Sequence, residues 1–230
     1  MNILNLIYPD RCPLCDTARP VKETGVCPEC SKKLITVKGH VCEKCGRPLD
    51  KEKMICDDCI ANNFSFDGGK SIYTYSSVSD SIYRLKYMNR AAYAKTYGRL
   101  MAREAKDWFE WIKPDALVPV PLHKNRLIKR GYNQAEELAD EISKQTGIPV
   151  AGYLVKRSKN TVPQKLVDKA GRQRNMKKAF IVEENVVSFK RIVLIDDIFT
   201  TGSTIDSLAR VLKDAGVKEV FFLTISRAGV

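Results

Sequence analysis

The last two thirds of the chain alternate between short apolar runs and amphipathic segments. Runs rich in Val, Ile, Leu and Phe predict buried strands, and apolar positions that recur every three or four residues predict helices. We predict strands at 70–77, 115–122, 150–157, 190–197 and 217–226, and helices within 77–112 and at 133–147 and 203–216. Strands that alternate with helices in this way favour an α/β fold with a mainly parallel sheet flanked by helices.

The first 60 residues lack this pattern and contain all eight cysteines, arranged as four Cys-x-x-Cys pairs. Two intervening residues let both thiolates of a tight turn reach one tetrahedral Zn²⁺. A disulfide framework is the alternative, but it requires an oxidising compartment, and the N-terminal residues do not resemble an export signal. We therefore predict two structural zinc sites, most simply paired in sequence order, although interleaved pairing also fits. The predicted ligands are Cys12, Cys15, Cys27, Cys30, Cys42, Cys45, Cys56 and Cys59.

The chain is predicted to divide into two domains. The cysteine-rich segment is too short and too polar to bury a core of its own, so metal would supply its folding energy. The stretch 62–69 is rich in Asn, Ser, Asp and Gly, which predicts a turn or linker. We expect a small cysteine module with two zinc sites over residues 1–62 and the α/β domain over residues 66–230.

Positive charge is concentrated in the middle of the chain. The formal net charge is +12, and residues 120–178 contain 14 Lys and Arg against 5 Asp and Glu. This favours an anionic partner, either a nucleic acid or a phosphorylated ligand, over the alternative of an ordinary solvated surface. No apolar run approaches the roughly 18 residues of a membrane span, and no secretory signal is recognisable, so a soluble cytoplasmic protein is expected.

The stretch "VLIDDIFTTGST" (193–204) combines an apolar strand end, two acids and a turn of small hydroxylated residues. Ligands of open α/β sheets bind at the carboxyl edge, and a helix that begins near Ser203 would offer its N-terminus to a phosphate. An ordinary capped turn is the alternative, but one capping residue would suffice for it. Carboxylates accept hydrogen bonds from sugar hydroxyls and attract Mg²⁺. The stretch therefore predicts a site for 5-phosphoribosyl-1-pyrophosphate (PRPP) with Mg²⁺.

This stretch closely resembles the signature of type I phosphoribosyltransferases. In that family the two acids contact the ribose and the loop binds the 5-phosphate. The resemblance assigns PRPP binding to Asp196, Asp197, Thr200, Thr201, Gly202, Ser203 and Thr204.

With the four cysteine pairs, "YRLKYMNR" (83–90) and "LVPVPLHKNRLIKRGYNQAEELA" (117–139), the whole chain resembles the competence protein F (ComF, ComFC) family. This resemblance implies a double zinc ribbon joined to a phosphoribosyltransferase-like domain, and a role in natural transformation, where incoming DNA is single-stranded. A DNA-translocating helicase and a recombinase loader would then be expected partners.

Two basic segments are candidates for contacts with the pyrophosphate. One follows the strand predicted at 115–122, where the resembling transferases have their pyrophosphate loop. The other resembles their mobile hood loop, and it would serve equally to clamp a DNA backbone. The candidates are Lys124, Arg126, Arg130, Arg157, Gln164, Arg172 and Arg174. For His123, a surface or capping role is favoured over phosphate contact.

The segment 83–90 interleaves aromatic and basic residues, as surfaces for single-stranded nucleic acid do. The candidates for DNA contact are Arg84, Lys86, Tyr87 and Arg90. The four-residue spacing of Tyr83 and Tyr87 instead favours a place for both rings in the core. We expect a protein that binds single-stranded DNA and PRPP. The alternative is an active phosphoribosyltransferase that acts on an unidentified base or amine.

Overall fold

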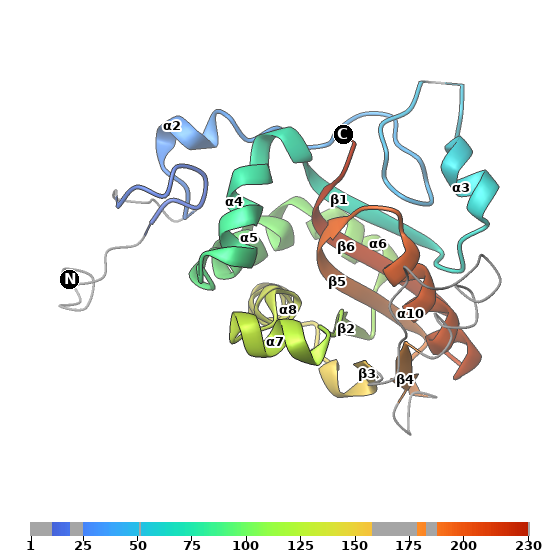
Figure 1. Ribbon diagram of the computed structural model, residues 1–230. Helices are drawn as coiled ribbons and strands as arrows, with labels where there is room; N and C mark the ends of the chain where they lie inside the picture. Colours follow the sequence, from blue (N-terminus) through green and yellow to red (C-terminus); the bar gives the residue numbers. More distant parts are fainter. Residues whose placement is uncertain (1–10, 19–24, 51, 158–178, 183–187, 230) are drawn as a thin grey trace, which may run out of the picture.

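The computed structural model describes residues 11–18, 25–50, 52–157, 179–182 and 188–229. Its centre is a four-stranded sheet in the order β1-β6-β5-β2, in which every neighbouring pair is parallel (Figure 1). The strands are β1 (Gly68–Thr74), β2 (Ala116–Pro119), β5 (Arg191–Phe199) and β6 (Glu219–Arg227). The predicted parallel α/β fold is confirmed.

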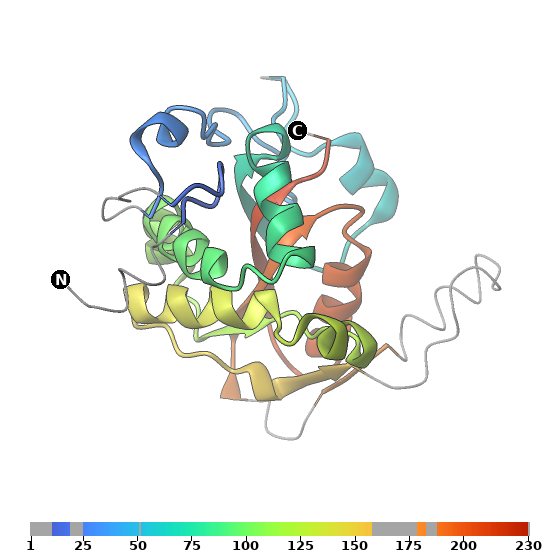
Figure 2. The same cartoon turned by 60° about the vertical axis from the view of Figure 1, so that its left-hand side comes forward.

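Helices cover both faces of this sheet, as Figure 2 shows. They are α4 (Tyr75–Tyr87), α5 (Ala92–Glu104), α6 (Lys106–Ile112), α8 (Gln134–Thr146) and α10 (Ser203–Asp214). The short helix α7 (Lys124–Arg130), which follows β2, has no buried residue. Val193 and Ile195 of β5 join the core beneath α4, α5 and α8, whereas Ile192 and Leu194 join the core beneath α10. Because both faces are buried, the central strands are continuous apolar runs rather than alternating ones.

Two predicted strands differ from the structure. The strand expected at 70–77 ends at Thr74, and α4 begins at once because Val78, Ile82 and Leu85 form a buried helical stripe. The strand expected at 150–157 meets the main sheet only through a bridge between Val150 and Leu117. After a 3₁₀ turn over Gly152–Leu154, its remainder is β3 (Val155–Arg157), which pairs antiparallel with β4 (Phe180–Val182).

The cysteine-rich segment packs directly against the sheet domain. It contains two short helices, α2 (Pro28–Ser31) and α3 (Asp57–Asn62), and its residues 35–37 run along the outer edge of β1. There the Val37 N–H donates to the Ile72 carbonyl at 2.8 Å, and the Thr74 N–H donates to the Ile35 carbonyl at 2.9 Å. These bonds cover part of a sheet edge that would otherwise be open to pairing with another chain.

Every helix among the described residues is too short or too polar to cross a membrane.

Candidate phosphoribosyl site

The turn between β5 and α10 has the local geometry of a phosphate loop. Gly202 is the N-cap of α10 and has a φ of 78°, which glycine adopts without steric cost. A Cβ at this position would lie 2.8 Å from Cζ of Phe199 and 3.1 Å from Cζ of Phe64. Next to it, the hydroxyl oxygens of Thr201 and Ser203 are 2.9 Å apart. The free N–H groups and dipole of the twelve-residue α10 favour an anion here.

A cavity of about 230 Å³ opens at the carboxyl ends of β2 and β5. It brings residues predicted for the 5-phosphate together with cations from three other parts of the chain. Its polar side chains are Lys86, Arg126, Arg130, Arg157, Asp196, Asp197, Thr200 and Thr204, and Gly202 also lines it. Thr201, Ser203 and Lys124 are not among the lining residues, and Gln164, Arg172 and Arg174 lie outside the described residues.

The two carboxylates of the cavity differ in their surroundings. Asp197 is 6% exposed, and its carboxylate forms an ion pair with Lys86. The distance between Nζ of Lys86 and Oδ1 of Asp197 is 2.7 Å. Asp196 accepts a hydrogen bond from the Asp197 N–H at 2.8 Å. Burial, followed by the neighbouring charge of Asp197, raises the pKa of Asp196 to about 7. Near neutral pH the lining that the described residues provide therefore has four cationic side chains and fewer than two full negative charges, which suits a polyanion.

The raised pKa of Asp196 predicts a pH dependence of stability in the absence of ligand. Between pH 3.8, the ordinary pKa of an aspartate, and about pH 7, the folded chain retains a proton on Asp196 that the unfolded chain releases. The free energy of unfolding should therefore fall as pH rises between about 4 and about 7, by at most about 4 kcal/mol from this group. Urea denaturation across this range, with Asp196→Asn as the comparison, tests the prediction. Parallel stability curves for the two proteins would contradict it.

The cations of the cavity are held by their own contacts. The Arg130 guanidinium lies 5.3 Å from the centre of the Tyr87 ring and donates to Oε1 of Gln134 at 2.9 Å. Arg157 lies over the Phe180 ring at 5.4 Å, and burial, with Arg126 nearby, lowers its pKa. These contacts hold the guanidinium groups at the cavity before any ligand arrives.

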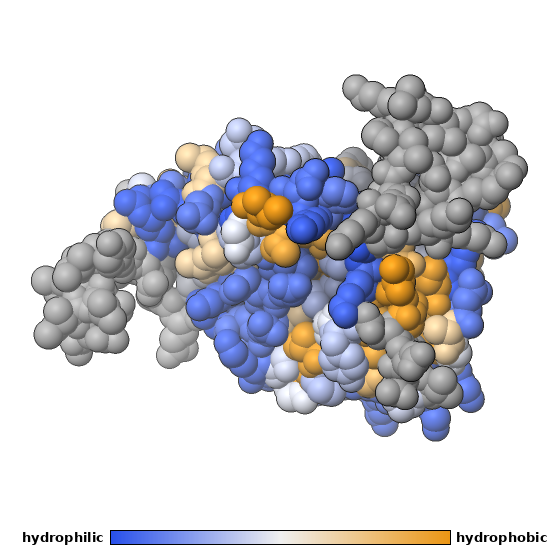
Figure 3. Space-filling view, turned by 60° about the horizontal axis from the view of Figure 1, so that its bottom comes forward, coloured by the Kyte–Doolittle hydropathy of each residue, from blue (hydrophilic) through white to orange (hydrophobic). Residues whose placement is uncertain are grey.

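Helix α7 is not among the helices predicted from the sequence. His123 is the N-cap of this helix, and its Nδ1 accepts a hydrogen bond from the Asn125 N–H at 3.2 Å, as its favoured capping role requires. Figure 3 shows the side of the molecule on which α7, β3 and β4 lie, where small hydrophobic groups are set among hydrophilic residues. Ile128 of α7 is 71% exposed.

The expectation that Tyr83 and Tyr87 belong to the core is wrong. Their exposed fractions are 59% and 61%, because the stripe through Ile82 and Leu85 faces the sheet and the tyrosines lie to one side of it. The two rings contact each other with 5.0 Å between their centres.

The three basic residues of the same segment have different surroundings. Arg84 donates to the Leu14 carbonyl at 2.6 Å, and Arg90 contacts Asp16 at 3.2 Å, so both engage the first zinc-ribbon loop. Lys86 is in the cavity instead. No sequence signal separates it from its neighbours, because its role depends on where the end of α4 meets β5.

The eight cysteines form two clusters in sequence order, which resolves the pairing left open above. The clusters are Cys12, Cys15, Cys27 and Cys30, and Cys42, Cys45, Cys56 and Cys59, with the ligand atoms of each within 4.8 Å of one another. Backbone N–H groups also point at the sulfurs, since Cys56 N–H donates to Cys42 Sγ at 3.3 Å. Four thiolates at this separation fit tetrahedral zinc, so the clusters are consistent with two zinc sites.

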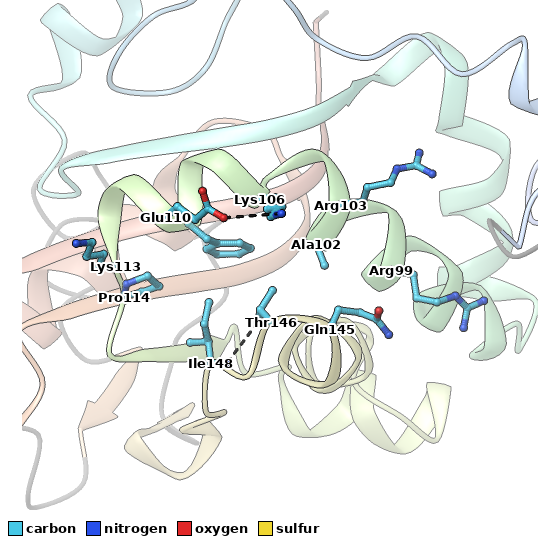
Figure 4. A pocket seen from close by; sticks show the side chains of 11 residues that line it. Arg99, Ala102, Arg103, Lys106, Glu110, Lys113, Pro114, Gln145, Thr146 and Ile148 are labelled. Carbon is cyan, nitrogen blue, oxygen red and sulfur yellow. Dashed lines mark hydrogen bonds and ion pairs between the residues drawn. The ribbon is translucent and has the colours of Figure 1, made fainter.

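A second cavity, of about 490 Å³, lies between α5, α6 and the end of α8 (Figure 4). Arg99, Arg103, Lys106 and Lys113 lie around its rim, and Phe109 and Ile148 contribute apolar surface. Its residues include Pro114, so it lies at the amino end of β2, opposite to the first cavity. Because open α/β sheets bind ligands at the carboxyl ends of their strands, the first cavity is the better candidate for the phosphoribosyl site.

Comparison with known proteins agrees with this arrangement. Residues 3–60 match the family model of the double zinc ribbon domain, and residues 89–229 match that of the phosphoribosyl transferase domain. The chain is 32% identical to Competence protein F of Haemophilus influenzae, over 99% of this chain and 100% of that protein. It is 30% identical to DNA utilization protein YhgH of Escherichia coli, over 94% of this chain and 96% of that protein.

Among solved structures, it resembles a glutamine phosphoribosylpyrophosphate amidotransferase from B. subtilis complexed with ADP and GMP. The TM-score is 0.41 at 20% identity, and the match covers 58% of this chain and 26% of that one.

Proposed function

We propose a function from the premise that this chain belongs to the competence protein F (ComF/ComFC) family, with its double zinc ribbon and phosphoribosyltransferase domain. The protein binds single-stranded DNA during DNA uptake in natural transformation, and it binds PRPP with Mg²⁺ in the cavity at the end of β5. The observation that carries this proposal is the meeting of two carboxylates, a hydroxyl-rich loop and four cations in that one cavity. We also propose that the zinc ribbon ends at residue 62, that the phosphoribosyltransferase-like domain begins at residue 66, and that the protein is cytoplasmic.

The proposed ligand divides its groups among the residues of the site. The loop Thr200–Thr204 and the start of α10 hold the 5-phosphate, where N–H and hydroxyl donors are concentrated. Arg126, Arg130 and Arg157 hold the pyrophosphate through charge-assisted hydrogen bonds. Asp196 and Asp197 accept hydrogen bonds from the ribose hydroxyls, and their carboxylate oxygens are ligands that Mg²⁺ prefers. The bound ion would neutralise charge on the pyrophosphate.

Several elements of the proposal rest on the family and on charge. The names of the relatives refer to competence and DNA utilization. The excess of positive charge in region 120–178 favours binding of a nucleic acid. The proposed residues for DNA contact are Arg84, Lys86, Tyr87 and Arg90. To contact DNA, Arg84 and Arg90 would have to give up their contacts with the zinc-ribbon loop. A DNA-translocating helicase and a recombinase loader are the proposed protein partners.

Binding to single-stranded DNA is expected to weaken steeply as salt concentration rises. Contacts between Lys or Arg and phosphates release counterions, so the logarithm of affinity falls linearly with the logarithm of salt, by about 0.7 per phosphate contact on a single strand. Fluorescence anisotropy of a labelled oligonucleotide across a salt series measures this slope. An affinity that does not change with salt would contradict binding along the phosphate backbone.

The alternative is an enzyme that transfers the phosphoribosyl group to an unidentified base or amine. It is favoured by the completeness of the signature from Asp196 to Thr204. Pyrophosphate release from PRPP with Mg²⁺, measured with bases, ammonia and single-stranded DNA as acceptors, distinguishes the two. Turnover with one acceptor would make the protein a phosphoribosyltransferase. Calorimetric PRPP binding without turnover would support a binding or sensing role, and absence of binding would refute the proposed site.

A further inference from the structure

We infer that single-stranded DNA reaches the phosphoribosyl cavity across Tyr83, Tyr87 and Arg130, which we call the tyrosine platform, and that DNA and PRPP therefore exclude each other. The inference rests on the proposed function, because it assumes that both ligands bind this protein. Beyond that function, we infer the path of the DNA strand, the residues on which its bases stack and the competition between the two ligands.

The two tyrosines provide an aromatic surface that the fold does not use. Their exposed fractions are 59% and 61%, and their rings lie 5.0 Å apart at 46° to each other. Neighbouring Met88, at 51% exposed, extends the apolar surface at the end of α4. Contiguous exposed aromatic side chains are typical of binding surfaces rather than of inert ones, and each nucleobase offers a face that can stack on such a ring.

The platform is continuous with the cavity. The Arg130 guanidinium lies over the Tyr87 ring at 5.3 Å and also lines the cavity wall. Lys86, adjacent to Tyr87 in sequence, pairs with Asp197 inside the cavity. Figures 1 and 2 agree that the carboxyl end of α4 lies beside α7. A strand that stacks on Tyr87 therefore has its phosphates within reach of the cavity's cations.

The chemistry of this surface fits a polyanion with flat apolar groups. The segment 121–135, which includes α7, contains four Lys and Arg and no Asp or Glu. On the same helix, Leu127 and Ile128 are 41% and 71% exposed. Alternating apolar and cationic contacts match the bases and phosphates of a single strand, whereas the bases of a duplex are already stacked on one another. An acidic peptide would satisfy the charges but offers no flat rings for the tyrosines.

Competition follows from the shared cations. Arg126 and Arg130 are the groups proposed to hold the pyrophosphate, and the same guanidinium groups meet a phosphate of the strand. Both guanidinium groups line this one cavity, so the two anions would need the same contacts. By linkage, whatever PRPP does to DNA affinity, DNA must do equally to PRPP affinity.

The test measures binding of a labelled oligothymidine by anisotropy, with and without saturating PRPP and Mg²⁺, and binding of PRPP by calorimetry. We expect PRPP to raise the apparent dissociation constant for DNA in proportion to its concentration. Tyr83→Ala with Tyr87→Ala should weaken DNA binding at least tenfold, since each lost stacking contact alone is worth roughly this factor. PRPP binding by Tyr83→Ala alone should stay within about twofold of the wild type, because Tyr83 does not line the cavity and the Tyr87 ring still holds Arg130.

The matched control is Tyr75→Ala with Tyr153→Ala, which removes two other exposed tyrosines, at 37% and 61% exposed, and should leave DNA binding unchanged. Simultaneous binding of DNA and PRPP, or equal loss in the control, would overturn the inference while leaving the proposed function intact. Binding of a duplex or a polyglutamate peptide as tightly as the oligothymidine would also overturn it. If the wild-type protein binds neither DNA nor PRPP, the proposed function itself fails.

Discussion

Replacing Asp196 and Asp197 together with asparagine is expected to abolish Mg²⁺-dependent binding of PRPP. Each carboxylate offers a charged acceptor to a ribose hydroxyl or to the metal, and a charged hydrogen bond contributes about 1.5–3 kcal/mol. Loss of two such contacts lowers affinity by at least about 100-fold. Isothermal calorimetry with PRPP and Mg²⁺ measures the change.

The fold should survive this double substitution because asparagine preserves the shape of aspartate. Removing the charge of Asp197 leaves Lys86 without its partner, but this is offset in part because a desolvated acid at Asp196 is removed as well. Circular dichroism and thermal unfolding test this. Asp80→Asn with Asp140→Asn removes the same charge from exposed positions and should bind PRPP normally. Unchanged binding by Asp196→Asn with Asp197→Asn would refute the assignment of the site.

Replacing Cys45 with serine is expected to reduce bound zinc from two ions per chain to one and to unfold the second half of the ribbon. Cys45 is fully buried, and its cluster belongs to the core that contains Phe66. A structural zinc site supplies about 10–16 kcal/mol in isolated zinc-finger peptides. Even part of that energy is large beside the total stability of a domain, about 5–15 kcal/mol.

Elemental analysis of the purified protein gives the zinc content, and limited proteolysis reports on folding of residues 42–59. Met54→Ser is the matched control, because it places serine at an exposed position of the same module. Two equivalents of zinc in the Cys45→Ser protein would show that this cluster does not hold its metal through four thiolates. Equal protease sensitivity of both variants would show that zinc does not order this half of the ribbon.

The parts of the fold that depend on local pattern could be predicted from the sequence. The apolar runs ending in Ile195 and Ile225 predicted buried strands, and cysteine spacing identified the eight residues that form the two clusters. Their sequential pairing needed the structure, because either pairing satisfies the spacing rule. Similarly, the region 150–157 is apolar enough for a strand, and only the structure shows its 3₁₀ turn over Gly152–Leu154 and the pairing of β3 with β4.

The residues of the candidate site that lie in one continuous segment could be predicted from the sequence. Those that come together from distant segments could not. The candidate phosphate loop lies within the single stretch 193–204, whereas Lys86 reaches Asp197 from more than one hundred positions away. Periodicity also misplaced Tyr83 and Tyr87. A four-residue spacing defines a helical stripe but does not say which stripe faces the core, and α4 carries an alternative stripe through Ile82.

Helix α4 connects the two modules through two side chains, Arg84 and Lys86, that are only two positions apart in the sequence. Arg84 is held by carbonyl groups of the first zinc-ribbon loop, and Lys86 is held by a carboxylate of the phosphoribosyl cavity. Substitutions in that loop and in the cavity therefore act on the same helix, and their effects on stability should not add. We therefore expect a ribbon from one relative to fit the α/β domain of another only if α4 keeps both attachments.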